Sequence, residues 1–138
     1  MLTDLFVANR DEAETLVSDF SRKPDLTTNN ADNSVLAGLW RVLDSSADVS
    51  ILEGDNCLAA MSTPEGPWVF DLPAAFLSAL SRLQEDQLAL TTSAWADTEE
   101  MQYSGARAED LIEPLRALRS LASNAVAQEK QLLLRLAM

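Results

Sequence analysis

Carboxylates are the residues most able to do chemistry in this sequence, because histidine is absent from all 138 residues. A chain without histidine cannot form a Ser-His-Asp or Cys-His catalytic arrangement, or a metal or haem site that depends on imidazole. It also lacks the side chain that most often acts as a general base near neutral pH. We therefore predict no catalytic residue and no bound cofactor, and an enzyme hypothesis has to rely on carboxylates and a metal ion.

The densest carboxylate cluster follows Trp95 and consists of Asp97, Glu99 and Glu100. On one continuous helix, Trp95 and Glu99 would share a face, and Asp97 and Glu100 would share another. These three carboxylates are candidate ligands for Mg²⁺ or Ca²⁺ if the fold brings further oxygen atoms to them. A carboxylate-based magnesium-dependent enzyme is therefore one hypothesis, and the competing interpretation is a solvated acidic end of a helix.

The single cysteine and the absence of a glycine-rich motif exclude further kinds of functional site. Cys57 has no second cysteine for an intramolecular disulfide, and it precedes an apolar run without a cationic neighbour, which predicts a buried, unreactive thiol. No glycine-rich phosphate-binding motif is present. The segment 53–56 offers oxygen atoms around a tight turn, but it lacks the additional acidic positions of a calcium loop.

The three tryptophans differ in their sequence surroundings. Trp40 lies in a stripe of leucines and is predicted to be a core residue, whereas Trp68 begins a strand after a Pro-Gly turn and is predicted to be half buried. Exposed tryptophans near acidic residues are plausible interface anchors, so we consider Trp68, Trp95, Glu99 and Glu100 as interface candidates. Core packing is the preferred interpretation of each tryptophan, and the interface role is the alternative. A homodimer that uses Trp68 or Trp95 is a further hypothesis.

The charge balance is strongly acidic, with 22 acidic and 10 basic residues and a net charge of −12. Binding to nucleic acid or to an anionic membrane surface needs a basic face, so both are disfavoured. A basic protein partner is allowed, and the negative field would steer its approach, although solubility alone also explains the acidity. The leading interpretation is a non-catalytic protein-interaction module. An immunity or inhibitor protein that blocks a basic toxin is a more specific alternative.

Hydrophobic periodicity and turn residues predict a helix-rich α+β fold in one domain over 1–138. About five helices would pack on a small sheet whose members include the N- and C-terminal strands. The expected strands are 2–8, 68–72 and 131–136. A first helix is expected to begin after Asn9, and four more helices are expected over 34–43, 73–83, 85–101 and 110–125. The segment 21–33 is predicted to be a polar loop, and 49–61 is either a hairpin or two helical turns.

Several boundary residues carry these predictions. Asn9 and Glu12 form a capping-box pattern before a helix whose apolar face would extend to Phe20. Asn33 or Ser34 is the expected cap of the next helix.

No stretch approaches the ~18 consecutive apolar residues of a membrane span. The N-terminal segment places an acidic residue before the first basic one, unlike a signal peptide. We therefore expect a cytoplasmic protein.

Two segments resemble a known group of proteins. They are Leu36-Ala-Gly-Leu-Trp-Arg-Val-Leu43 and Gly66-Pro-Trp-Val-Phe-Asp-Leu-Pro-Ala-Ala-Phe76, the latter continuing through Leu80 to Glu85-Asp86. The arrangement resembles small uncharacterised bacterial proteins, and it also resembles the YfbM-like family, in which a helix with a Leu/Trp stripe precedes a Gly-Pro strand and a proline-started helix. The resemblance covers about a third of the chain. The resemblance implies an α+β bacterial cytoplasmic protein, and it implies no particular activity.

Overall fold

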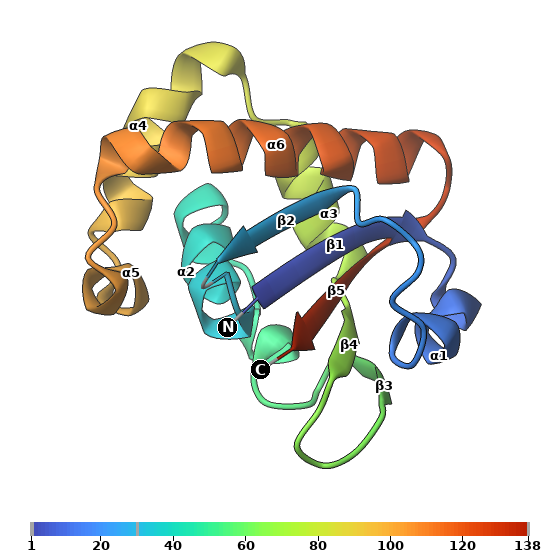
Figure 1. The fold of residues 1–138 in the computed structure, drawn as a ribbon. Helices are drawn as coiled ribbons and strands as arrows, with labels where there is room; N and C mark the ends of the chain where they lie inside the picture. Colours follow the sequence, from blue (N-terminus) through green and yellow to red (C-terminus); the bar gives the residue numbers. More distant parts are fainter. Residues whose placement is uncertain (1, 30, 138) are drawn as a thin grey trace.

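The computed structural model describes residues 2–29 and 31–137 and contains a five-stranded antiparallel sheet with strand order β2-β1-β5-β4-β3 (Figure 1). The strands are β1 (Leu2–Ala8), β2 (Leu26–Asn29), β3 (Leu58–Met61), β4 (Trp68–Asp71) and β5 (Gln131–Ala137). The terminal strands β1 and β5 pair along their whole length, from Leu2↔Ala137 to Ala8↔Gln131. The predicted α+β class and the predicted presence of both terminal strands in the sheet are confirmed.

Helices cover the two faces of this sheet unequally. The helices are α1 (Ala13–Leu16), α2 (Asn33–Leu43), α3 (Ala74–Ser81), α4 (Leu88–Ala96), α5 (Glu99–Ser104) and α6 (Ala108–Ala127), with one-turn 3₁₀ helices η1 (Arg10–Glu12), η2 (Val49–Leu52) and η3 (Glu85–Gln87). Figure 1 shows α2 and α3 behind the sheet, α6 across its upper side and α1 near β3 and β4 on the other side. We call the face covered by α2, α3 and α6 the first face, and the face covered by α1 the second face.

The main hydrophobic core lies on the first face. Alternate strand residues such as Leu5 and Leu134 point into it because side chains alternate between the two faces of a strand. Trp40 and Phe76 pack against each other there, with ring centroids 5.7 Å apart. In the three helices that cover this face, the residues predicted to face the core are buried except Leu43, which is partly buried. The buried ones are Leu36, Leu39, Trp40, Phe76, Leu77, Leu80, Leu83, Leu115, Leu118, Ala122 and Ala125. Trp40 is therefore a core residue, as the sequence predicts.

The second face has a smaller core built around an ion pair. Arg135 is 2% exposed, and its Nη2 atom donates a hydrogen bond to Asp4 Oδ2 at 2.8 Å. The Arg135 guanidinium also lies over the rings of Phe6 and Phe20, at 4.8 Å and 4.1 Å from the ring centroids. Its Nη1 atom donates to the Leu16 carbonyl at 2.9 Å, which fixes the end of α1 to the sheet. This face thus combines a short helix with a buried charge.

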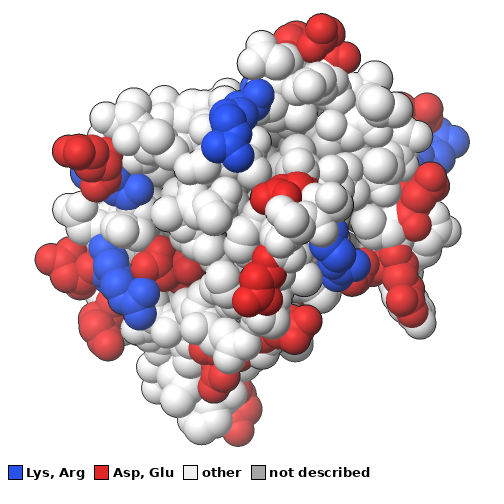
Figure 2. Space-filling model, turned by 180° about the vertical axis from the view of Figure 1, so that it is seen from behind, with Lys and Arg blue, Asp and Glu red and all other residues white. Residues whose placement is uncertain are grey.

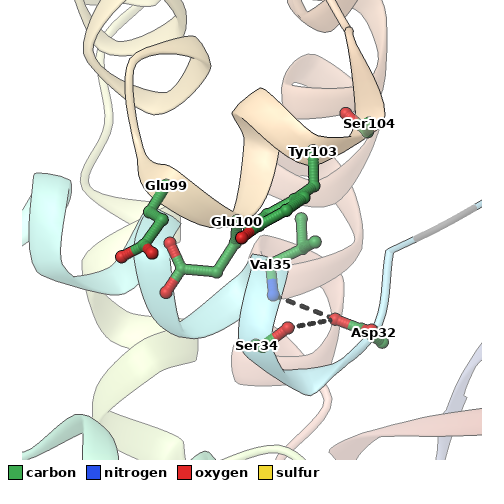
Figure 3. A pocket seen from close by; sticks show the side chains of 7 residues that line it. All are labelled: Asp32, Ser34, Val35, Glu99, Glu100, Tyr103 and Ser104. Carbon is green, nitrogen blue, oxygen red and sulfur yellow. Dashed lines mark hydrogen bonds between the residues drawn. The ribbon is translucent and has the colours of Figure 1, made fainter.

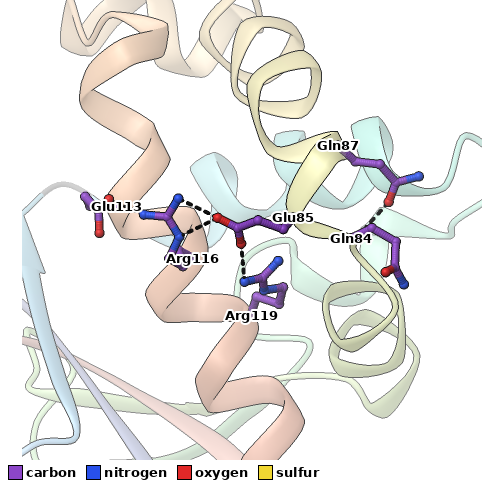
Figure 4. A network of polar contacts seen from close by, with 6 residues as sticks. All are labelled: Gln84, Glu85, Gln87, Glu113, Arg116 and Arg119. Carbon is purple, nitrogen blue, oxygen red and sulfur yellow. Dashed lines mark hydrogen bonds and ion pairs between the residues drawn. The ribbon is translucent and has the colours of Figure 1, made fainter.

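A network of ion pairs attaches η3 to α6 (Figure 4). Arg116 and Arg119 both donate to the carboxylate of Glu85 at 2.6 Å, and Arg116 also pairs with Glu113. Hydrogen bonds from the two arginines hold the pKa of Glu85 below its ordinary value. The neighbouring arginines Arg116 and Arg119 are therefore paired within the protein itself.

The prediction of a polar loop over 21–33 was wrong at residues 26–29. Strand β2 forms there because it pairs antiparallel with β1, as in Thr3↔Thr28 and Asp4↔Thr27. Asn30, which the loop prediction also included, lies outside the described residues. The preceding helix ends at Leu16, so Phe20 is 52% exposed and covers Arg135 from a loop instead of a helical face.

The segment 49–61 combines both predicted alternatives. Val49–Leu52 is a 3₁₀ turn, and Leu58–Met61 is a strand, but the strand pairs with β4 and does not form a hairpin with 49–52. The intervening 53–56 segment is a turn, as predicted, with Gly54 at a φ of 55°.

Three helix boundaries differ from the predictions. Asp32, not Asn33 or Ser34, caps α2 through its side chain. The helix predicted over 85–101 is interrupted because Thr98 accepts a hydrogen bond from the Met101 amide and starts α5 as a new helix. Asp97 and Glu100 therefore do not share a helix face. Finally, α6 starts at Ala108, two residues earlier than predicted.

Candidate functional site

A mainly apolar hollow lies between the start of α2, η2 and the β3–β4 hairpin. We call it the apolar groove, and its volume is about 670 Å³. Its floor consists of buried core side chains, and its open side carries Leu58, Met61 and Trp68, which are partly or largely exposed. The full lining is Asp32, Asn33, Ser34, Ala37, Leu52, Glu53, Gly54, Asp55, Leu58, Met61, Pro64, Trp68, Phe70 and Leu136. A hollow of this size and apolarity falls within the range of ligand-binding sites.

The β3–β4 hairpin positions the exposed side chains of the groove. Met61 and Trp68 are direct cross-strand partners, so their side chains lie next to each other on the first face. Gly66 has a φ of 94°, and a Cβ atom at this position would lie 2.9 Å from the Trp68 ring. The ring of Trp68 therefore packs directly on the backbone of Gly66. Trp68 is half buried, as predicted, and Met61 is 50% exposed.

The rim of the apolar groove is acidic. Asp32 comes from the cap of α2, and Glu53 and Asp55 come from the turn after η2. No Lys or Arg lines the groove among the described residues. Charge of one sign around an apolar centre distinguishes this hollow from an ordinary gap between core elements.

A second hollow, also about 670 Å³, opens beside the first one. We call it the acidic hollow, and it is lined by Asp32, Ser34, Val35, Glu99, Glu100, Tyr103 and Ser104 (Figure 3). In Figure 3 the Tyr103 ring extends from α5 toward Glu100, while Asp32 lies at the start of α2. Tyr103 is 87% exposed. The hollow therefore contains the two predicted interface candidates Glu99 and Glu100.

The position of α5 against α2 sets the shape of the acidic hollow. Gly38 allows this approach, because a Cβ atom there would meet Glu100 Oε2 at 3.3 Å and the Thr98 side chain at 3.4 Å. Glu100 also accepts a hydrogen bond from Arg41 Nη2 at 3.4 Å, which links α5 to the solvent side of α2. Glu100 is thus half buried at the helix contact, whereas Glu99 is exposed to solvent.

Hydrogen bonds fix the start of α2, which separates the two hollows. Asp32 Oδ1 accepts from the Val35 amide at 3.0 Å and from Ser34 Oγ at 2.8 Å (Figure 3). Below it, Trp95 Nε1 donates to the Val35 carbonyl at 3.1 Å. Trp95 is only 2% exposed, so its packing matches the core alternative and does not fit a role as an interface residue.

The predicted metal candidates do not converge. Asp97 is exposed at the end of α4 and lines neither hollow, while Glu99 and Glu100 are on α5. Within residues 2–29 and 31–137, no group of three or more His, Cys, Asp or Glu side chains is arranged to hold a metal ion. The thiol of Cys57 is buried, and burial together with the nearby Asp71 carboxylate raises its pKa above the ordinary value. A raised pKa lowers the thiolate fraction, as expected for an unreactive cysteine.

On the face seen from behind, acidic side chains are scattered and do not form one continuous surface (Figure 2). In this view several separate acidic groups are visible, some with a basic side chain beside them, and uncharged areas lie between them. Local charge around the two hollows is therefore more informative about binding than the net charge of the chain.

Sequence reasoning identified Trp68, Glu99 and Glu100 but missed Asp32, Met61 and Tyr103. Met61 and Trp68 flank a short Pro- and Gly-containing segment, which is the signal that would have paired them. The convergence of α5 on the start of α2 has no comparable local signal.

No family model, no curated protein and no solved structure matches this chain. The resemblance to the YfbM-like family stays a prediction. No helix in the described part of the chain is both long and apolar enough to cross a membrane.

Proposed function

We propose that this protein is a non-catalytic interaction module that binds a segment of a partner protein in the apolar groove. The observation that carries the proposal is the exposure of Met61 and Trp68 as neighbours over an open apolar hollow of about 670 Å³. Large apolar side chains on a surface concavity lose contact with water when a partner covers them, which favours association. Tryptophan and methionine are also enriched at the centres of protein interfaces.

The surroundings of the groove support binding rather than chemistry. Its polar side chains are carboxylates, a serine and an amide. The one hydroxyl, Ser34 Oγ, donates to Asp32 Oδ1, but the same carboxylate oxygen also accepts from the Val35 amide as the cap of α2, so this contact belongs to the helix start. An inhibitor of a basic toxin is a more specific version of the same proposal, in which the segment belongs to a folded basic protein.

A selection of random linear peptides displayed on phage, carried out on the immobilised protein, tests this proposal. We expect the wild-type protein to enrich peptides with large apolar side chains. One enriched peptide, made synthetically, should lose at least about tenfold in affinity to Met61→Glu, because the carboxylate would have to be buried on binding. Isothermal titration calorimetry measures this loss.

Leu90→Glu is the matched control, because Leu90 is an exposed apolar residue on α4 that does not line either hollow. Its peptide affinity should equal that of the wild type. The proposal fails if no peptide is enriched above the bare support, or if Met61→Glu and Leu90→Glu bind the peptide equally well.

A further inference from the structure

The apolar groove and the acidic hollow meet at the start of α2. Both are lined by Asp32 and Ser34, so these two residues form a wall common to the two hollows. On one side of this wall lie Met61 and Trp68, and on the other side lie the acidic residues of α5. A single extended or helical segment that leaves the groove over the start of α2 therefore enters the acidic hollow.

Most of the carboxylates around the two hollows have no ion-pair partner among the described residues. Among the described residues, no ion pair includes Asp32, Glu53, Asp55 or Glu99. Glu100 has one cationic neighbour, Arg41. Neither hollow is lined by Lys or Arg in the part of the chain that the structure describes. Carboxylates grouped in this way attract cations, so a partner segment with positive charge would be complementary to these two hollows.

Two further side chains line the path of such a segment, one in each hollow. The exposed ring of Tyr103 lies beside the acidic hollow, and the faces of aromatic rings bind ammonium and guanidinium groups (Figure 3). The side chain of Asn33 lines the groove, and both of its polar atoms are buried without a hydrogen-bond partner among the described residues. A peptide bond offers one acceptor and one donor, which match the amide of an asparagine side chain.

We infer that the partner segment carries an apolar side chain for the groove and an Arg or Lys a few residues away for the acidic hollow. This inference rests on the proposed function and adds the charge of the partner to it. Arginine fits the acidic hollow better than lysine, because its planar guanidinium can bind a carboxylate in a bidentate manner and stack on Tyr103. Asp32 is placed to contact both parts of the segment.

The experiment is a parallel phage selection of random linear peptides on the wild type, on Glu99→Gln/Glu100→Gln and on Asp11→Asn/Glu14→Gln. The last variant removes two exposed carboxylates beside the second face and serves as the matched control. We expect the wild type and the control to enrich peptides that combine apolar and basic residues, and the Glu99/Glu100 variant to lose the preference for basic residues.

One synthetic peptide from the wild-type selection is then titrated by calorimetry. At low salt, Glu99→Gln/Glu100→Gln should weaken its affinity about threefold to tenfold, and Asp11→Asn/Glu14→Gln should leave it unchanged. The difference between the two variants should shrink at high salt, because salt screens exposed charges.

Two results would overturn the inference. If the selected peptides lose affinity to Met61→Glu but contain no basic residue, and if Glu99→Gln/Glu100→Gln binds them normally, the inference is wrong while the proposed function stands. If basic peptides bind Met61→Glu as well as the wild type, the attraction is a non-specific effect of the acidic chain, and both proposals fail.

Discussion

The two faces of the sheet are stabilised in different ways. On the first face, α2, α3 and α6 bury a continuous apolar core that includes Trp40 and Phe76. On the second face, the four-residue helix α1 covers a smaller cluster, and the buried Arg135–Asp4 pair provides specific polar contacts. The first face therefore depends on packed apolar area, and the second depends on the geometry of a few groups. The binding surface that we propose lies where the helices of the first face leave the sheet uncovered.

Phe76→Ala should cause the largest loss of stability, because it removes a fully buried ring from the first face. A buried aromatic residue replaced by alanine lowers the free energy of unfolding by about 3–5 kcal/mol. Urea denaturation followed by circular dichroism measures this change. Phe20→Ala on the second face is the control, and its loss should stay below about 1.5 kcal/mol because the ring is half exposed. Equal losses for the two variants would contradict the difference between the faces.

Asp4→Ala should have the next largest effect, about 3 kcal/mol, because it leaves the Arg135 guanidinium buried without its carboxylate. The double variant Asp4→Leu/Arg135→Met should recover much of this loss, since an apolar pair avoids burying charge. Urea denaturation of Asp4→Leu, Arg135→Met and the double variant measures the coupling between the two positions. A double variant as unstable as the sum of the single variants would show that the pair does not act as a unit.

Glu85→Gln should have the smallest effect, and the size of this effect should depend on pH. The folded-state pKa of Glu85 is lowered by hydrogen bonds from Arg116 and Arg119. A carboxyl with a lowered folded pKa stabilises the fold above its unfolded pKa, and this contribution is lost as the pH falls through the folded pKa. The wild type should therefore have the higher melting temperature near neutral pH, and the difference should disappear in acid well below the ordinary value of 4.5.

Thermal unfolding followed across the pH range measures this effect. Glu14→Gln on α1 is the control and should show no such pH-dependent difference, because Glu14 takes part in no ion pair within the described residues. A melting-temperature difference for Glu85→Gln that persists in acid would mean that Glu85 stabilises the fold by packing and not by charge.

The sequence predicted most of the elements because their apolar patterns are strong and local. The terminal strand is an instructive case, since leucine favours helix, yet β5 has Leu132, Leu133 and Leu134 buried on alternating faces of the sheet. Its length and position indicated a strand despite this preference. Strand β2 was missed because its residues are mostly polar, and it forms only through pairing with β1.

The candidate site was predicted less completely than the fold. Trp68 was recognised because a Pro-Gly turn precedes it, and Glu99 and Glu100 were recognised because they are clustered in the sequence. Asp32 joins the two hollows only because Trp95 and α5 hold the start of α2 in place, and these contacts join residues about sixty positions apart. Such long-range contacts leave no local pattern that a single sequence could reveal.

The pairing of β1 with β5 affects the order in which the fold can assemble. Asp4 and Arg135 pair across the sheet, so 130 intervening positions have to be synthesised before the central pair of strands can form. Contacts over such sequence separations close slowly because a long loop has to be ordered first. During translation the apolar residues of β1 therefore remain without β5, whereas the β1–β2 and β3–β4 pairs join strands that are closer in the sequence and can form earlier.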